Sequence, residues 1–139
     1  MRTSIYIDGF SHGANPVPAA SVIGQQLVTG AIFGTVRETG RLPESAEDQC
    51  RLMFVNAQRI LQAAGADFAH VIKMTFFLRP EASRELLNEH WVQAFPDAAS
   101  RPARHVIVSQ TLPAGMSMQC DLLAVLPQPL AAVPRAAGT

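Results

Sequence analysis

The amino-acid sequence predicts an α+β domain in which two helices pack on one face of a mixed β-sheet. Two segments carry apolar residues at three- and four-residue spacing, which is typical of amphipathic helices. Several shorter runs are rich in β-branched residues and are bounded by glycine or proline, which is typical of strands. A helix that connects two strands favours a parallel or mixed sheet, and 139 residues is the size of one domain.

The first part of the chain is expected to form strands. Residues 3–8 form a short strand, and the loop of residues 12–18 that follows is broken by glycine and proline. The segment 21–34 contains two strands joined near Gly24. Gly30 lies within the second of these strands, and it indicates a β-bulge or a place where another group approaches the backbone closely.

The two helices are predicted over residues 46–64 and 82–95. Ser45 is a good N-cap for the first helix, with Asp48 three residues later, and Gly65 provides the left-handed residue that ends it. Its buried stripe is expected to consist of Cys50, Met53, Ala57, Ile60, Leu61 and Ala64.

Three more strands are predicted at residues 70–78, 104–109 and 117–126, so the order of elements is β-β-α-β-α-β-β with an additional N-terminal strand. Both helices then lie on one face, and the other face is left bare. Because only 16% of the residues are charged, we expect another subunit to cover that face. Residues 1–127 form the single domain, and residues 128–139 are expected to be a disordered tail.

The composition argues against several classes of function. A net charge of zero and a pI of about 6.9 do not provide the basic surface that nucleic acid requires. Cys50 and Cys120 are expected to be buried free thiols, and the four histidines have no metal-ligand spacing, so no metal or cofactor is expected. No apolar run is long enough to span a membrane, and the N-terminus does not resemble a signal peptide. We therefore expect a cytoplasmic protein.

The chemistry that remains centres on Arg104, at the start of a strand. Arg101 precedes Pro102, which favours an extended conformation in solvent. Arg104 shares a strand face with Val106, and its guanidinium is either solvated or aimed at an anion such as a carboxylate.

Gln119 and Asp121 form a polar pair on an otherwise apolar strand, and two interpretations stay open for them. They form either a polar patch at a sheet edge or subunit boundary, or a group that positions water beside the anion. An ionised Asp121 has the chemistry of a general base, whereas Gln119 orients water without taking its proton.

Several motifs make the sequence similar to the Rid family of reactive-intermediate deaminases, also called the YjgF family. They are NPVP at 15–18, GQQLVTGAI at 24–32, AAGADFAHVIKMTFFL at 63–78, LLNEHW at 86–91 and PARHVIVSQTLP at 102–113. The resemblance runs from about residue 14 to residue 126.

The resemblance implies a chorismate-mutase-like protomer and a homotrimer with three sites in clefts between subunits. It also implies hydrolysis, without a cofactor, of enamine or imine acids such as 2-aminoacrylate or 2-iminopropionate to a 2-keto acid and ammonia. In this family the arginine of the P-A-R motif, here Arg104, holds the substrate carboxylate. Asn88 also matches the family pattern, and Val106 is among the residues after the arginine that shape the pocket.

Three residues depart from that pattern. Val17 stands where active members carry tyrosine, Gly30 where they carry serine, and Gln119 where they carry glutamate. The smaller side chains at positions 17 and 30 widen the cleft and suit a bulkier enamine acid. The alternatives are a non-catalytic binder or regulator of small carboxylates, an activity like that of an endoribonuclease, and a trimeric scaffold.

Overall fold

A computed structural model describes residues 1–130, and its elements follow the predicted order with one short extra helix. Residues 131–139, which include most of the expected tail, lie outside the described residues. The elements are β1 (Thr3–Ile5), β2 (Ala20–Ile23), β3 (Gln26–Thr29), α1 (Ala46–Ala63), the 3₁₀ helix η1 (Phe68–His70), β4 (Val71–Leu78), α2 (Arg84–Ala94), β5 (Ala103–Val108) and β6 (Met118–Val125).

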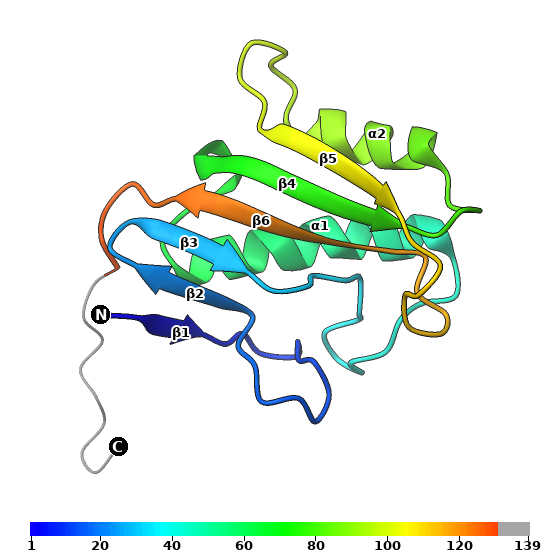
Figure 1. Ribbon diagram of the computed structural model, residues 1–139, viewed down its shortest axis with the longest axis horizontal. Helices are drawn as coiled ribbons and strands as arrows, with labels where there is room; N and C mark the ends of the chain where they lie inside the picture. Colours follow the sequence, from blue (N-terminus) through cyan, green and yellow to red (C-terminus); the bar gives the residue numbers. More distant parts are fainter. Residues whose placement is uncertain (131–139) are drawn as a thin grey trace.

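All six strands form one sheet, in the order β1-β2-β3-β6-β4-β5. Strands β4 and β5 are parallel because α2 connects them, and every other pair is antiparallel. Both helices lie on the same face of this sheet, as Figure 1 shows. The predicted α+β architecture, a mixed sheet with two helices on one face, is therefore confirmed.

Capping residues set the ends of the helices. The Ser45 hydroxyl accepts a hydrogen bond from the backbone N–H of Asp48, as predicted, and Gly65 follows α1 with a φ of +75°. Helix α2 begins later than predicted because Ser83 is its N-cap and accepts from the backbone N–H of Leu86. Ala82 therefore precedes the helix.

The hydrophobic core lies between the helices and the sheet. Alternate residues of β6 are buried there, and these are Met118, Cys120, Leu122 and Ala124. The predicted stripe of α1 packs against them, and burying each large apolar side chain contributes roughly 2 kcal/mol. Cys50 and Cys120 are both buried and free, as predicted, and burial raises the pKa of Cys50 to about 12.

The loop before β6 is held by the fully buried side chain of Gln49. Its Nε2 donates to the carbonyls of Pro43 at 2.9 Å and Gly115 at 2.8 Å. Its Oε1 accepts from the backbone N–H of Ser117, also at 2.8 Å. Two loop carbonyls and one loop N–H thus gain a hydrogen-bond partner in Gln49, which fixes where β6 begins.

The opposite face of the sheet carries none of the helices of residues 1–130 (Figure 1). Several of its apolar side chains are exposed, among them Ile23 at 60%, Val28 at 47% and Val125 at 42%. That another subunit covers this open face remains a prediction.

Two further observations concern the end of the chain and the membrane. Leu130, three residues beyond the expected domain boundary, is half-buried against the core.

Within the part of the chain that is described, no helix is both long and apolar enough to cross a membrane.

Gly34 and Gly30 give a matched test of the packing around Gln49. A Cβ added at Gly34 would lie 2.0 Å from the backbone oxygen of Gln49, whereas one added at Gly30 would approach no atom closer than 3.9 Å. We expect Gly34→Ala to lower the free energy of unfolding by about 3 kcal/mol, and Gly30→Ala to change it by less than about 1 kcal/mol. Urea unfolding at one protein concentration measures both values, and equal midpoints would contradict this packing.

Candidate functional site

Arg104 lies on β5, where its side chain contacts α2. It pairs with Met74 of β4, whose side chain is fully buried, so Arg104 points to the helix-covered side of the sheet. Its Nη1 donates to Oδ1 of Asn88 at 2.8 Å. Its guanidinium carbon lies 5.0 Å from the ring centroid of Trp91, a cation–π contact. Two helix residues thus orient a half-buried cation.

The electrostatic surroundings of Arg104 favour an anionic ligand. Burial lowers the pKa of Arg104, and the nearby charge of Arg84 lowers it further. An arginine nevertheless stays protonated in proteins. None of the ion pairs among residues 1–130 involves Arg104, and Asn88 is the only side chain there to which it donates a hydrogen bond. The remaining N–H donors match the geometry of a carboxylate.

Val106 follows Arg104 on the same side of the sheet, as the alternation predicted. It pairs with the buried Phe76 and is itself half-buried against the core. Val106 therefore forms an apolar wall one strand position beyond the guanidinium.

Gln119 and Asp121 lie on the open face instead. Gln119 pairs with Phe77 and Asp121 with Thr75, and these β4 residues alternate with the buried ones. His105 also pairs with Thr75, so it shares a cross-strand row with Asp121. The idea that Gln119 and Asp121 stand beside the ligand of Arg104 therefore does not hold within one chain, because the sheet separates them.

Asp121 is half-buried, and this environment changes its acidity. Burial raises the pKa of the Asp121 carboxyl, and the positive charge of Lys73 opposes that rise. Lys73 lies on β4 beside Thr75, the partner of Asp121.

Val17 and Gly30 come together at a separate hollow of about 230 Å³, which Val28 and Thr29 also line. A Cβ on Gly30 would lie 3.9 Å from Nε2 of His12, and this nitrogen is 2.7 Å from the carbonyl oxygen of Ala31. Gly30 comes directly after β3 rather than within a strand, and a Cβ added there would make only ordinary van der Waals contacts.

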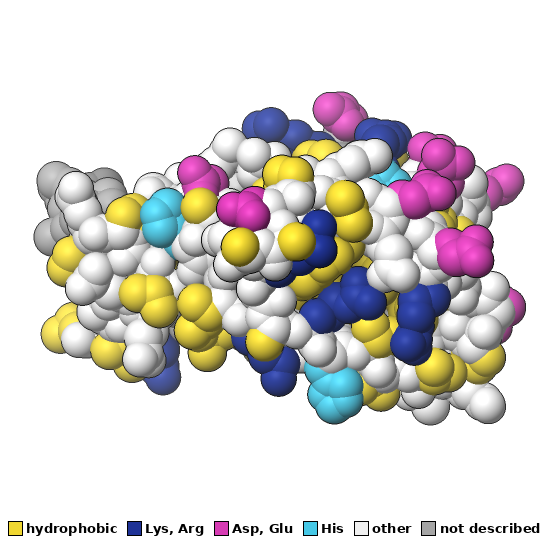
Figure 2. All heavy atoms as spheres, turned by 90° about the horizontal axis from the view of Figure 1, so that it is seen from above, with side chains coloured by type: hydrophobic (Ala, Val, Ile, Leu, Met, Phe, Trp, Pro, Cys, Tyr) yellow, Lys and Arg dark blue, Asp and Glu magenta, His cyan; other side chains and the backbone are white. Residues whose placement is uncertain are grey.

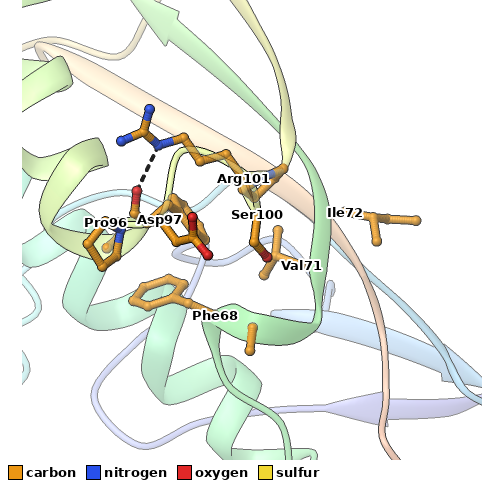
Figure 3. Close-up of a pocket in the computed structure, with 11 residues that line it drawn as sticks. Phe68, Val71, Ile72, Pro96, Asp97, Ser100 and Arg101 are labelled. Carbon is orange, nitrogen blue, oxygen red and sulfur yellow. Dashed lines mark hydrogen bonds between the residues drawn. The ribbon is translucent and has the colours of Figure 1, made fainter.

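Arg101 lines a larger hollow of about 470 Å³ between η1 and the loop before β5 (Figure 3). It is exposed, as predicted, but its Nε donates to the carbonyl of Phe95 at 2.8 Å. In Figure 3 the guanidinium lies at the α2 end of the hollow, away from Phe68. None of the predicted site residues lines this hollow, so its volume does not make it the better candidate.

Sequence reasoning missed three residues close to the predicted ones, namely Arg84, Trp91 and His12. The four-residue spacing of Arg84 and Asn88 on a helix was a usable signal, since such residues are neighbours. The contact of His12 with Ala31 joins residues far apart in sequence, and no local pattern indicates it. Among residues 1–130, no three His, Cys, Asp or Glu side chains form a group that could hold a metal ion.

The link between Lys73 and Asp121 can be tested by titration. Because the cation lowers the pKa of the carboxyl, we expect Lys73→Gln to raise the pKa of Asp121 further. Carbon-13 NMR of the labelled aspartate side chains measures the shift directly. Arg51→Gln is the control, because Arg51 pairs with Asp48 on α1. An Asp121 pKa that falls or stays constant in Lys73→Gln would contradict this arrangement.

The raised pKa of Asp121 also predicts how the stability of the protein depends on pH. A carboxyl whose pKa is raised by folding binds more protons in the folded state. Its contribution therefore falls as pH rises from its unfolded pKa, near 4, through its folded value. We expect the free energy of unfolding of Asp121→Asn to change less with pH over this range than that of wild type. Curves for the two proteins that run parallel would contradict this prediction.

Comparisons with known proteins match most of the chain. Residues 12–126 match the family described as Endoribonuclease L-PSP. Reactive Intermediate Deaminase A of Arabidopsis thaliana, a chloroplastic protein, is 34% identical over 112 residues, which are 80% of this chain and 59% of that protein. A RutC family protein of Aquifex aeolicus is 30% identical over 116 residues, which are 79% of this chain and 92% of that protein.

A solved structure of Escherichia coli TdcF with bound serine has the same fold. It superposes with a TM-score of 0.79 at 25% identity and covers 88% of this chain and 98% of that one. The chain therefore belongs to the Endoribonuclease L-PSP family, which is the Rid family that its sequence motifs resemble.

Proposed function

We propose that this protein is a cofactor-independent hydrolytic deaminase of reactive enamine and imine acids. The observation that carries the proposal is the half-buried guanidinium of Arg104, oriented by Asn88 and Trp91 and without an ion-pair partner among residues 1–130. The name of one relative, Reactive Intermediate Deaminase A of Arabidopsis thaliana, supports deamination as the class of reaction.

The reaction is hydrolysis of a carbon–nitrogen double bond. An enamine acid such as 2-aminoacrylate tautomerises to its imine, water adds to the imine carbon, and the nitrogen leaves as ammonia. The product is a 2-keto acid. Orienting the substrate by its carboxylate and placing one water beside it are proximity and electrostatic effects, which an arginine and backbone amides supply.

A complete site of this kind requires two chains. Arg104 and Gln119 lie on opposite sides of one sheet, so a ligand on the arginine does not reach the glutamine of the same chain. In the homotrimer that the sequence resemblance implies, we place the Arg104 edge of one chain against the open face of the next. The exposed apolar side chains on that face, such as Val28, support such an assembly.

Within that cleft we assign the water to Gln119, with Asp121 as the alternative. Gln119 orients water through its amide but does not remove a proton. Asp121 has the chemistry of a general base, and the pKa raised by burial makes it a stronger one than an exposed aspartate. The space beside Val17 and Gly30 suits an enamine acid larger than 2-aminoacrylate.

A second candidate is binding of a small carboxylate without turnover, and Gln119 is the observation that favours it. A residue that cannot take a proton stands where active Rid members carry glutamate, while the guanidinium of Arg104 persists. TdcF with bound serine is a relative that holds a small amino acid. Endoribonuclease activity, which the family description names, gains no support from a net charge of zero.

The role of Arg104 is tested by ammonia release from an enzymatically generated pool of 2-iminopropionate. We expect wild type to accelerate release and Arg104→Ala to lower kcat/KM by about 100-fold, because it removes charged hydrogen bonds to the carboxylate. Arg51→Gln is the control, because it removes an arginine of α1 that pairs with Asp48 and does not belong to the proposed site.

The outcomes separate the candidates. An unchanged rate in Arg104→Ala would remove the arginine from the mechanism, and no acceleration by wild type would remove this substrate. Calorimetry with pyruvate distinguishes the two candidate functions, since binding that needs Arg104 without any turnover identifies the binder.

A further inference from the structure

Three arginines lie along α2 and the start of β5. Arg84 begins α2, Arg104 lies midway beside Asn88 and Trp91, and Arg101 is bound to the carbonyl of Phe95 at the end of α2. None of the ion pairs among residues 1–130 includes any of the three. Figure 2 views the molecule from above, the side where Figure 1 places α2 and β5. Lys and Arg side chains gather there beside hydrophobic ones, and Asp and Glu side chains lie along one side of them.

Arg84 occupies a position that does not favour its charge. It is the first residue of α2, directly after the N-cap Ser83. The N-terminal end of a helix carries a partial positive charge, so a cation there is unfavourable by a few tenths of a kcal/mol. Its charge also reaches Arg104, whose pKa it lowers. An anion between the two guanidinium groups would remove both unfavourable interactions.

The spacing of the two cations follows from the helix. Arg84 and Asn88 are four residues apart on α2, so their side chains are neighbours about one turn, roughly 5.4 Å, apart along the axis. Nη1 of Arg104 is bonded to Asn88, so its guanidinium lies close to that next turn. A ligand with two carboxylates joined by two or three carbons suits this separation.

We propose that Arg84 is a specificity residue and that the substrates of the Arg104 site are 2-imino dicarboxylic acids. The 2-carboxylate binds Arg104, and the distal carboxylate binds Arg84. This inference rests on the proposed function, because it names the substrate class of the same site. Water adds to C2 of the imine, the bond from C2 to nitrogen breaks, and ammonia leaves. The product is a 2-oxo dicarboxylic acid whose new carbonyl oxygen comes from water.

Arg101 is the less suitable partner for the distal carboxylate. Its Nε is already bonded to the carbonyl of Phe95, at the far end of α2 from Arg84. The neighbouring charge that lowers the pKa of Arg104 is that of Arg84.

Calorimetry with a matched pair of product analogues tests the assignment. 2-Oxoglutarate and 2-oxopentanoate have the same chain length and differ in the distal carboxylate. We expect wild type to bind the diacid more tightly, and Arg84→Gln to reduce the ratio of the two affinities by about fivefold at low salt, since this exposed ion pair is screened by salt. Arg84→Lys keeps the charge and should keep most of the preference, and Arg51→Gln on α1 should leave the ratio unchanged.

The inference is overturned if wild type does not prefer the diacid, or if Arg84→Gln keeps the wild-type ratio while its thermal melt shows a folded protein. Ammonia release from the corresponding pair of imines separates this result from the proposed function. Acceleration of both imines without a diacid preference overturns the specificity alone. A diacid preference in binding without any acceleration overturns the deaminase and keeps Arg84 as a binding residue.

Discussion

The alternation of side chains along β4 and β6 is the constraint on which the rest of this structure depends. Successive residues of a strand face opposite sides of the sheet, so burying Met118 and Cys120 under the helices turns Gln119 outward. The same rule, carried through the pairing with Met74, turns Arg104 toward α2. One sheet therefore separates the cation from the polar pair. Any site that uses both halves has to be assembled from two chains.

Sequence patterns were enough to predict the order of the strands and main helices, but not the side of the sheet on which each site residue lies. The caps of α1 and the face shared by Arg104 and Val106 are local, and each was predicted, whereas the N-cap of α2, Ser83, was missed. Whether Gln119 lies on that same side depends on the register of three strands, including the irregularity between Val71 and Lys73 in β4. Such register is set by core packing over long sequence distances. The contact between His12 and Ala31 likewise exists only in the folded chain.

The distribution of charge gives the edge of the molecule along α2 its chemistry. The chain as a whole is neutral, yet Arg84, Arg101 and Arg104 share one edge of the molecule. Trp91 and Asn88 orient the central guanidinium, which reduces the entropy it would lose on binding a carboxylate. In the assembly that we propose, the neighbouring open face supplies the water-handling residues and excludes solvent, which strengthens these charge interactions.

The central claim, that each site is shared between two chains, is tested most directly by complementation. Arg104→Ala removes the cation of one half, and Gly30→Phe fills the hollow of the other half. Each variant alone should lack imine hydrolysis. When the two are coexpressed, random mixing should restore about a quarter of the sites, because one chain then supplies Arg104 and its neighbour the open hollow. Mixed assemblies that release ammonia no faster than either variant alone would contradict a shared site.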